Sequence, residues 1–285
     1  MPVGQRCGYN RALAKVGGDW MADLSGKVAV VTGASRGVGR GVAEGLAEAG
    51  ATVYVTGRSE SHEQPPAERT IQATAASVDA LGGKGIAVAV DHNDDAAVEA
   101  LFQRVAEEQG RLDVLVNNAY KIPDPPVFSG GFWEHPVSVW DDQCGVGLRG
   151  YYVASVFAAP LMVAQGSGLI VNISSRGGDE YVFSTSYGVG KCGVDRMAKD
   201  MAVELKDYGV AALSLRPSAV KTEFVLDAVQ EGNMQIDPER AESPRFSGRC
   251  VAALASDPEV MAKSGGVYSV KELAAQYGFV DPDRD

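Results

Sequence analysis

Two side chains that could move a proton lie four residues apart in the segment SSRGGDEYVFSTSYGVGK, which begins at Ser174. Tyr187 and Lys191 would share one face of a helix, because residues i and i+4 are neighbours on a helix surface. An ammonium beside a phenol favours the phenolate and lowers a phenol pKa that is ordinarily about 10. Such a tyrosine can protonate a carbonyl oxygen as hydride arrives, or take the proton in reverse. A solvated Tyr/Lys pair on a helix surface is the alternative interpretation.

Hydroxyl groups precede this pair at the predicted end of a buried strand, residues 169–173. Ser174 and Ser175 would lie at the carboxyl edge of that strand, which is where ligands bind in open α/β sheets. A hydroxyl there could hydrogen-bond the same carbonyl oxygen. The segment therefore predicts acid/base chemistry on a carbonyl or an alcohol.

The elements that would position this chemistry begin with KVAVVTGASRGVG, residues 27–39. An apolar, β-branched run without polar alternation is typical of a parallel strand buried on both faces. The glycines that follow permit positive φ and close backbone approach, so a pyrophosphate could bind at the N-terminus of the next helix. The spacing departs from GxGxxG, and an ordinary strand-turn-helix stays open from the glycines alone. The predicted cofactor residues here are Gly33, Ser35, Arg36, Gly37, Val38 and Gly39.

The second predicted strand, residues 52–56, ends without an acidic side chain. In dinucleotide folds an acid at this position accepts from the 2′-hydroxyl of NAD. Arg58 follows the strand instead, and together with Arg36 it could bind a 2′-phosphate, although both could be solvated surface arginines. The balance favours NADP(H) over NAD(H). Asp91, at the end of the third strand over residues 86–90, could reach an adenine amino group or cap the next helix.

Strand and helix patterns then alternate along the rest of the chain, which predicts an α/β fold: a doubly wound parallel sheet of about seven strands in a single Rossmann-fold domain, residues 23–285. Residues 1–22 would be an N-terminal extension, either disordered or an upstream-start artefact. The further strands are expected over residues 112–116, 169–173 and 265–270. The first of the further helices is expected to begin at Pro65 and Pro66 and to end near residue 81. The other helices are expected over residues 96–109, 138–164, 223–230, 243–255 and 270–278. The loops near 120–137 and 218–245 are expected to form the substrate pocket, with a plain surface loop as the alternative for the first.

Composition excludes several classes of function. The net charge is −11 and no basic run exists, which argues against a nucleic-acid surface. The four cysteines form no CxxC and the three histidines show no ligand spacing, so we expect reduced thiols, a cytoplasmic setting and no metal site. No run of about 18 apolar residues exists, and no membrane span is expected.

The motifs together resemble those of the short-chain dehydrogenase/reductase family. TGASRGVG (32–39) is similar to its TGxxxGxG loop, NNA (117–119) to its NNAG motif and YGVGK (187–191) to its YxxxK. The resemblance implies Tyr187 as acid/base, Lys191 on the nicotinamide ribose, and a carbonyl-polarising serine, which alignment to SSxxG makes Ser175 rather than Ser174. It also implies cofactor contacts from Asn118, Ala119, Pro217, Val220 and Thr222.

The same resemblance implies an NADP(H)-dependent oxidoreductase for a ketone, aldehyde, steroid-like or quinone substrate, or for the corresponding alcohol. A non-catalytic NADP-binding redox-sensing scaffold and an isomerase or dehydratase of the same family are the alternatives. Helices near 146–163 and 186–205 resemble those through which the family pairs subunits, so a homodimer or homotetramer is expected. Tyr120 and Ser218 replace glycines of the family pattern, and Gly147 replaces its active-site asparagine. We expect Gly147→Asn to be tolerated, because glycine leaves the backbone free and the proton path would use main-chain carbonyls and water.

Overall fold

The computed structural model describes residues 22–60 and 67–284. All but the last residue of the predicted extension 1–22, and the predicted helix start at Pro65 and Pro66, lie outside the described residues. The described chain forms one seven-stranded sheet of order β3-β2-β1-β4-β5-β6-β7, and every pair of neighbouring strands is parallel. The predicted single-domain α/β fold with a doubly wound sheet is confirmed.

The elements follow the predicted alternation closely. The strands are β1 (Val28–Val31), β2 (Thr52–Gly57), β3 (Lys84–Ala89), β4 (Val114–Asn117), β5 (Gly168–Ile173), β6 (Val210–Arg216) and β7 (Val267–Ser269). The helices are α1 (Gly37–Glu48), α2 (Ile71–Ala80), α3 (Asp95–Gln109), α4 (Ser138–Cys144), α5 (Gly150–Gln165), α6 (Thr185–Leu205), α7 (Glu223–Gln230), α8 (Pro244–Ser256) and α9 (Val270–Tyr277).

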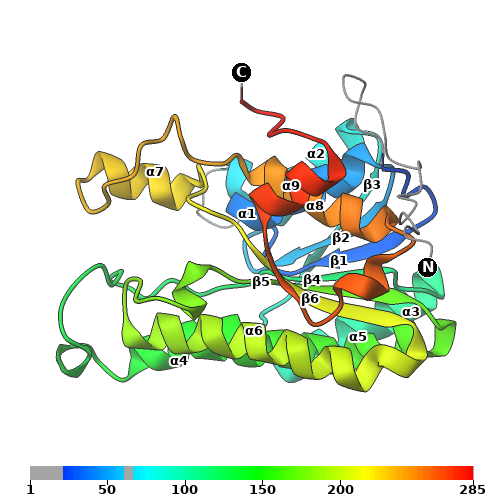
Figure 1. Ribbon diagram of the computed structural model, residues 1–285, viewed down its shortest axis with the longest axis horizontal. Helices are drawn as coiled ribbons and strands as arrows, with labels where there is room; N and C mark the ends of the chain where they lie inside the picture. Colours follow the sequence, from blue (N-terminus) through cyan, green and yellow to red (C-terminus); the bar gives the residue numbers. More distant parts are fainter. Residues whose placement is uncertain (1–21, 61–66, 285) are drawn as a thin grey trace, which may run out of the picture.

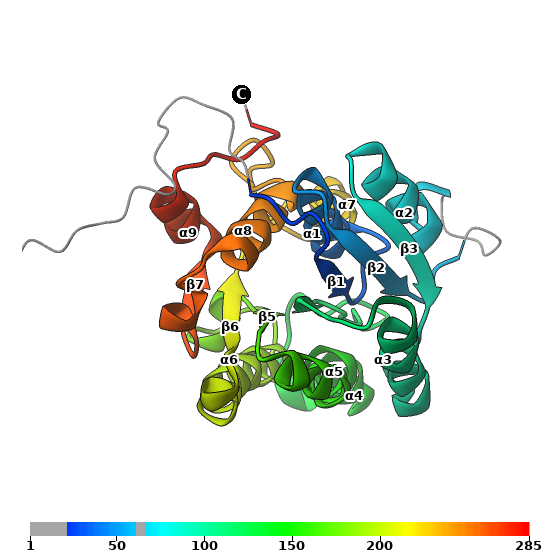
Figure 2. The same cartoon turned by 90° about the vertical axis from the view of Figure 1, so that its right-hand side faces the viewer.

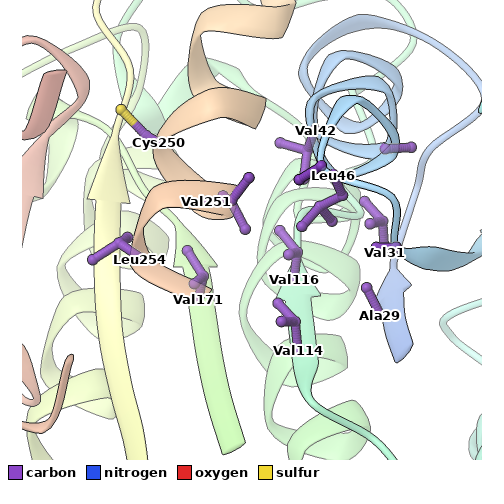
Figure 3. Close-up of a cluster of buried hydrophobic side chains, with 14 of the residues drawn as sticks. Ala29, Val31, Val42, Leu46, Val114, Val116, Val171, Cys250, Val251 and Leu254 are labelled. Carbon is purple, nitrogen blue, oxygen red and sulfur yellow. The ribbon is translucent and has the colours of Figure 1, made fainter. Parts of the chain in front are cut away.

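Helices cover both faces of the sheet (Figures 1 and 2). The layer of α1, α2, α8 and α9 packs on one face, and that of α3, α4, α5 and α6 lies on the other (Figure 1). Alternate strand residues point to opposite sides, so Val31 and Val116 join the core under α1 and α8, while Val30 and Leu115 join the core under α3 and α5 (Figure 3 shows the first cluster). Because both faces are buried, the strands need apolar residues throughout, which is the reason for their unbroken β-branched runs.

Two predicted helix boundaries differ from the structure. α2 begins only at Ile71, because the Thr70 hydroxyl caps it by accepting from the Ala73 N–H at 3.1 Å. The single helix predicted over 138–164 is α4 and α5 joined by a π-helical turn, Gly145–Arg149. A π turn inserts an extra residue into the helix, so it changes which side chains the run directs toward the sheet edge.

One helical run, Ser138–Gln165, is long and apolar enough to cross a membrane by length and composition alone, among the residues that the structure describes. Half of its most apolar window is buried inside the fold. A core helix that packs on a sheet meets the same criterion, so the run is weak evidence for a membrane span.

The sheet changes direction of winding between β1 and β4, which pair through Val31 and Val116. Ligands of doubly wound sheets bind outside the carboxyl ends of the strands at this point. The glycine loop after β1, the Asn-Asn-Ala segment after β4 and the serines after β5 all lie at that edge. The fold therefore brings the three predicted motifs to one place.

Candidate active site

The predicted catalytic side chains meet at the carboxyl end of β5. The Tyr187 hydroxyl donates to Ser175 Oγ at 3.0 Å, and Lys191 Nζ donates to the Ile173 carbonyl at 3.0 Å. Tyr187 and Lys191 lie one turn apart on α6, as their spacing predicts. One carbonyl oxygen could contact both hydroxyl groups, because they are already within hydrogen-bond distance of each other.

Two caps hold these hydroxyl groups in place. Ser184 begins α6 by accepting from the Tyr187 N–H at 3.2 Å, and Ser175 begins a 3₁₀ turn by accepting from the Gly177 N–H at 3.0 Å. Ser174 is buried and its hydroxyl donates to the Lys191 carbonyl at 3.4 Å. The structure therefore places Ser175, and not Ser174, beside the reacting phenol.

The pKa of Tyr187 differs from the expectation. Burial raises the pKa of its phenol, and the hydrogen bond with Ser175 and the charge of Arg176 oppose this only in part. The predicted lowering by Lys191 is wrong in this structure, because the ammonium stands 5.9 Å from the centroid of the Tyr187 ring and points to a carbonyl. A raised pKa keeps the phenol protonated at neutral pH, as a proton donor requires.

Lys191 is buried, and burial lowers the pKa of its ammonium to about 8 while Asp195 opposes the shift. Its Nζ lies 5.3 Å from the ring centroid of Tyr120 and 5.9 Å from that of Tyr151. Together with Tyr187, these rings form what we call the tyrosine box around Lys191. Ring faces attract a cation, so the box favours the charged lysine.

The space beside Gly147 is taken by Tyr120. A Cβ atom at position 147 would lie 2.6 Å from Tyr120 Cδ2, closer than real Cβ contacts, in the π turn between α4 and α5. The Tyr120 ring cannot easily yield, because it packs edge-on against Tyr187 and lies beside the buried Gln143. The expectation that Gly147→Asn is tolerated is therefore wrong: the two departures from the family pattern, Tyr120 and Gly147, are one packing arrangement.

A cleft of about 300 Å³ opens beside the glycine loop. Its walls fit a dinucleotide, because a Cβ on Gly39 would lie 2.4 Å from Asn118 Nδ2 and one on Gly33 would lie 2.6 Å from Ala119 Cα, so only glycine leaves this backbone cradle open. Gly33 and Gly37 also have positive φ. The predicted cofactor residues that line the cleft are Gly33, Ser35, Arg36, Gly37, Val38, Gly39, Arg58, Asp91, Asn118, Ala119 and Thr222.

Asn118 acts on the glycine loop itself. Its side-chain amide donates to the carbonyls of Thr32 and Gly33 at 2.9 and 3.0 Å, and the Thr32 hydroxyl accepts from the N–H groups of Asn118 and Ala119. These bonds tie the end of β4 to the loop after β1. Asn118 therefore shapes the cradle in addition to lining it.

Charged groups gather at one end of the cleft. Arg36 is exposed, and Arg58 lies 4.0 Å from Asp91 with both side chains about half exposed. His92, which the sequence analysis did not identify, also lines this end and is hydrogen-bonded to the Thr56 hydroxyl at 2.9 Å. Burial lowers the pKa of His92 to about 4, so the ring is neutral at physiological pH.

The stretch after β6 lies apart from the cleft, except at Thr222. Val220 is buried and pairs with Glu242, and Pro217 is not among the cleft residues. Ser218, where the family pattern has glycine, donates its N–H to the Glu242 carboxylate at 3.0 Å and does not adopt positive φ. Serine is therefore compatible with this turn.

A second, apolar hollow of about 60 Å³ adjoins Tyr187. The predicted substrate loop supplies one wall, and Phe183 and α7 supply others; the Phe128 and Phe224 rings are stacked at 6.0 Å across it. The interpretation of residues 120–136 as a pocket wall agrees with this placement. Phe183 and Phe224 were missed, because single aromatic residues next to a helix start give no distinctive sequence signal.

Glu223 was also missed by sequence reasoning. It is the first residue of α7, and its carboxylate accepts from the Gly37 N–H at 3.0 Å, at the N-terminus of α1. An acid in a first helical turn usually complements its own helix dipole, so nothing in the sequence indicated this long-range contact.

Within residues 22–60 and 67–284, no group of three or more His, Cys, Asp or Glu side chains could hold a metal ion. Cys144, Cys192 and Cys250 are free thiols. Cys7 lies outside the described residues.

Comparison with known proteins gives a consistent result. Residues 27–232 match the family model of the short chain dehydrogenases. The chain is 46% identical over 275 residues to mouse dehydrogenase/reductase SDR family member 1, covering 92% of this chain and 85% of that protein.

Solved structures agree with this match. A putative short-chain alcohol dehydrogenase from Sinorhizobium meliloti is 28% identical, with a TM-score of 0.73 over 87% of this chain and 96% of its own. A metagenomic short-chain oxidoreductase in complex with NADP is 30% identical, with a TM-score of 0.67 over 83% of this chain and 93% of its own.

Proposed function

Because the chain belongs to the short-chain dehydrogenase family, we propose that it transfers hydride between NADP(H) and a carbonyl or alcohol substrate. The observation that carries this proposal is the 3.0 Å hydrogen bond between the Tyr187 hydroxyl and Ser175 Oγ, next to a buried Lys191 and between the glycine cleft and an apolar hollow. A phenol and a second hydroxyl that can reach one oxygen are what carbonyl reduction requires of a protein.

In the direction of reduction, Tyr187 gives its proton to the carbonyl oxygen while the Ser175 hydroxyl donates a hydrogen bond to that oxygen. Ser175 is already fixed by its hydrogen bond from the Gly177 N–H, so little conformational entropy is lost when it positions the carbonyl beside the phenol. Lys191, whose ammonium is bonded to the Ile173 carbonyl, would hold the nicotinamide ribose, as the family resemblance implies. A proton taken up from solvent would restore the phenol for the next turnover.

The glycine cradle, Asn118 and Thr222 would hold the dinucleotide, and a bound nicotinamide would supply or accept the hydride. Selectivity for NADP(H) is supported by Arg36 and Arg58 at one end of the cleft, since guanidinium groups bind phosphate with charge-assisted hydrogen bonds. Asp91 is engaged by Arg58, which reduces its repulsion of a 2′-phosphate. The NADP complex of the metagenomic relative is consistent with this choice.

The substrate class follows from the apolar hollow. Its walls are proline, aliphatic and aromatic side chains, and its polar groups are confined to Tyr120, Gln143 and Tyr187. Such a surface, with few polar groups among many apolar ones, favours a hydrophobic carbonyl over a strongly polar one. We therefore favour aromatic or alicyclic ketones, steroid-like ketones and quinones.

The experiment is a panel of carbonyl compounds followed at the NADPH absorbance, with the Tyr187→Phe variant beside the wild type. Turnover of a hydrophobic carbonyl should fall by about 10³-fold or more in Tyr187→Phe, while NADPH affinity stays within about twofold, because only the acid/base oxygen is removed. NADPH binding without turnover of any compound would favour the scaffold. Turnover that survives in Tyr187→Phe would refute the proposed acid.

We also propose that the protein is a homodimer or homotetramer in a reducing, cytoplasmic setting. The support for assembly is an apolar outer face on α4, α5 and α6, where Trp140, Tyr152, Val156, Val189 and Val203 are exposed. The support for the setting is the three free thiols.

A further inference from the structure

We propose that Tyr120 is a positioning residue for Lys191, and that Gly147 is glycine so that the Tyr120 ring can reach this place. The proposal rests on the proposed hydride transfer for its consequence in turnover, but its geometry stands alone. It assigns a role to two positions at which the chain departs from its family's pattern.

The first step is the packing of position 147. Tyr120 follows β4, and Gly147 is buried in the π turn between α4 and α5, yet a Cβ there would lie 2.6 and 3.0 Å from the Tyr120 Cδ2 and Cε2 atoms. Any larger side chain at 147 would push the ring away from Lys191. The glycine is therefore a condition for the ring's position.

The second step is how the ring is held. Its edge packs on Tyr187 at a centroid distance of 6.0 Å and an interplanar angle of 87°, and the buried Gln143 lines the same hollow beside it. Gln143 also accepts from the hydroxyl groups of Ser184 and Ser186 at the start of α6. Tyr120 is thus linked to the same helix that carries Tyr187 and Lys191, and little freedom is left to it.

The third step concerns the contacts that keep the buried Lys191 ammonium charged and in place. Among the described residues its Nζ donates one hydrogen bond, to the Ile173 carbonyl, and the ring of Tyr120 is the nearest member of the tyrosine box at 5.3 Å. A buried ammonium without enough partners would lose its proton or turn away. The Tyr120 face adds a favourable contact to the ammonium without adding a negative charge.

The groups that face Lys191 come from four elements. α6 contributes Asp195, which raises the pKa of Lys191, and Asp195 is itself paired with Arg216 of β6. β5 contributes the Ile173 carbonyl, and α5 contributes the Tyr151 ring. Because Asp195 and Arg216 compensate each other, the loss of one ring face should move the titration of Lys191 measurably.

The first test needs no turnover. Lysine labelled with carbon-13 in NADPH-free protein allows the pKa of Lys191 to be followed by NMR, with Lys191→Met identifying the signal. Tyr120→Leu should lower this pKa, because a ring face that favours the cation is lost, and Tyr120→Phe, which keeps the face, should restore most of the difference. An unchanged pKa in Tyr120→Leu, measured on folded protein, would overturn the proposal.

The second test uses the pH profile of kcat with phenanthrenequinone. In Tyr120→Leu the alkaline limb should move toward neutral pH, so that activity is lost by about tenfold above pH 8 and by much less near pH 6.5, where Lys191 stays protonated. Phe128→Leu is the matched control: it removes a ring from the same hollow, one that stacks on Phe224, and it should raise KM without moving the limb. Equal losses of activity at all pH values would mean that Tyr120 contributes to packing and does not act on the charge of Lys191.

A double-mutant cycle tests the link to Gly147. Gly147→Ala should lower kcat and the melting temperature in the wild type, and both effects should largely vanish in a Tyr120→Gly background, where the ring is gone. Equal effects in both backgrounds would overturn the link. If Gly147→Ala alone does not fold, recovery of folding in the double variant is the supporting result, and failure of both is the contrary one. Absence of turnover in the wild type would contradict the proposed function, while the NMR result would still decide the role of Tyr120.

Discussion

The Glu223 carboxylate accepts a hydrogen bond from the Gly37 main-chain N–H at 3.0 Å, although the two residues are 186 positions apart. The N–H belongs to the N-terminus of α1, where a dinucleotide phosphate would bind in this fold. The acid therefore fills an anion position and fastens α7 to the glycine loop. Asp227 on the same helix pairs with Arg69 at 3.5 Å, so α7 is tied both to the glycine loop and to the segment before α2.

Glu223→Gln should tighten NADPH binding by roughly threefold to tenfold, because it removes a negative charge that competes with phosphate, and tenfold is about 1.4 kcal/mol. Titration calorimetry at low and high salt measures this. Glu231→Gln, at the far end of α7, makes the same charge change on an exposed carboxylate that accepts from the Asn233 side chain at 3.1 Å. Equal gains in both variants would reduce the effect to general charge.

Arg36→Ala and Arg58→Ala should each weaken NADPH binding by about tenfold and leave NADH binding within about twofold, since a charge-assisted bond contributes ~1.5 to 3 kcal/mol. Fluorescence titration with both cofactors compares the variants. Arg104→Ala, a surface arginine paired with Glu108, is the control for net charge. A parallel loss for NADH would show that the arginines do not read the 2′-phosphate.

Ser175→Ala and Ser174→Ala should separate catalysis from stability. Ser175 contacts the Tyr187 hydroxyl, so its loss should lower kcat by about 10²-fold with little change in melting temperature. Ser174 bonds the Lys191 carbonyl inside the core, so its loss should cost ~1 kcal/mol of unfolding free energy. Steady-state kinetics and thermal melting measure the two effects, and the reverse pattern would exchange the assignments.

The lowered pKa of His92 predicts that the free energy of unfolding decreases as the pH falls below neutral. Burial is the main cause that lowers its folded-state pKa to about 4, whereas the unfolded ring titrates near its ordinary value of 6.5. Between these values the unfolded chain binds the extra proton, so the free energy of unfolding falls as pH decreases, by at most ~1.4 kcal/mol per pH unit, and the slope ends below the folded pKa. Melting from pH 7 to 5 should show a smaller decrease in His92→Asn than in the wild type. An identical decrease would assign the pH dependence to other groups.

Assembly can be tested on two valines of nearly equal exposure. Val203 on α6 is 77% exposed and Val280 near the C-terminus is 76% exposed. Val203→Glu should shift the wild-type oligomer toward monomer in light scattering at micromolar concentration, because it places a charge in the apolar face of α4, α5 and α6, whereas Val280→Glu should not. A monomeric wild type would refute the proposed assembly.

Local sequence determined the order of the elements and the first outline of the site. The apolar runs that become β1 and β4 could be read as buried parallel strands, because both of their faces need apolar residues. The spacing of Tyr187 and Lys191 placed both on one turn of a helix, and the glycines marked the cradle, because these signals lie within a few residues. Topology then followed, since parallel strands with helical crossovers have few arrangements.

The tertiary structure decided what depends on contacts between distant segments. Ser175 was distinguished from Ser174 by which hydroxyl turns toward Tyr187, and the fit of Tyr120 against Gly147 depends on where a loop returns to a π turn. The Glu223 carboxylate can accept from the Gly37 N–H only because α7 begins beside the glycine loop. Burial, which raises the pKa of Tyr187 and lowers that of Lys191, is likewise a property of the packed fold, because the cost of removing a charge from water depends on every neighbour that excludes the water.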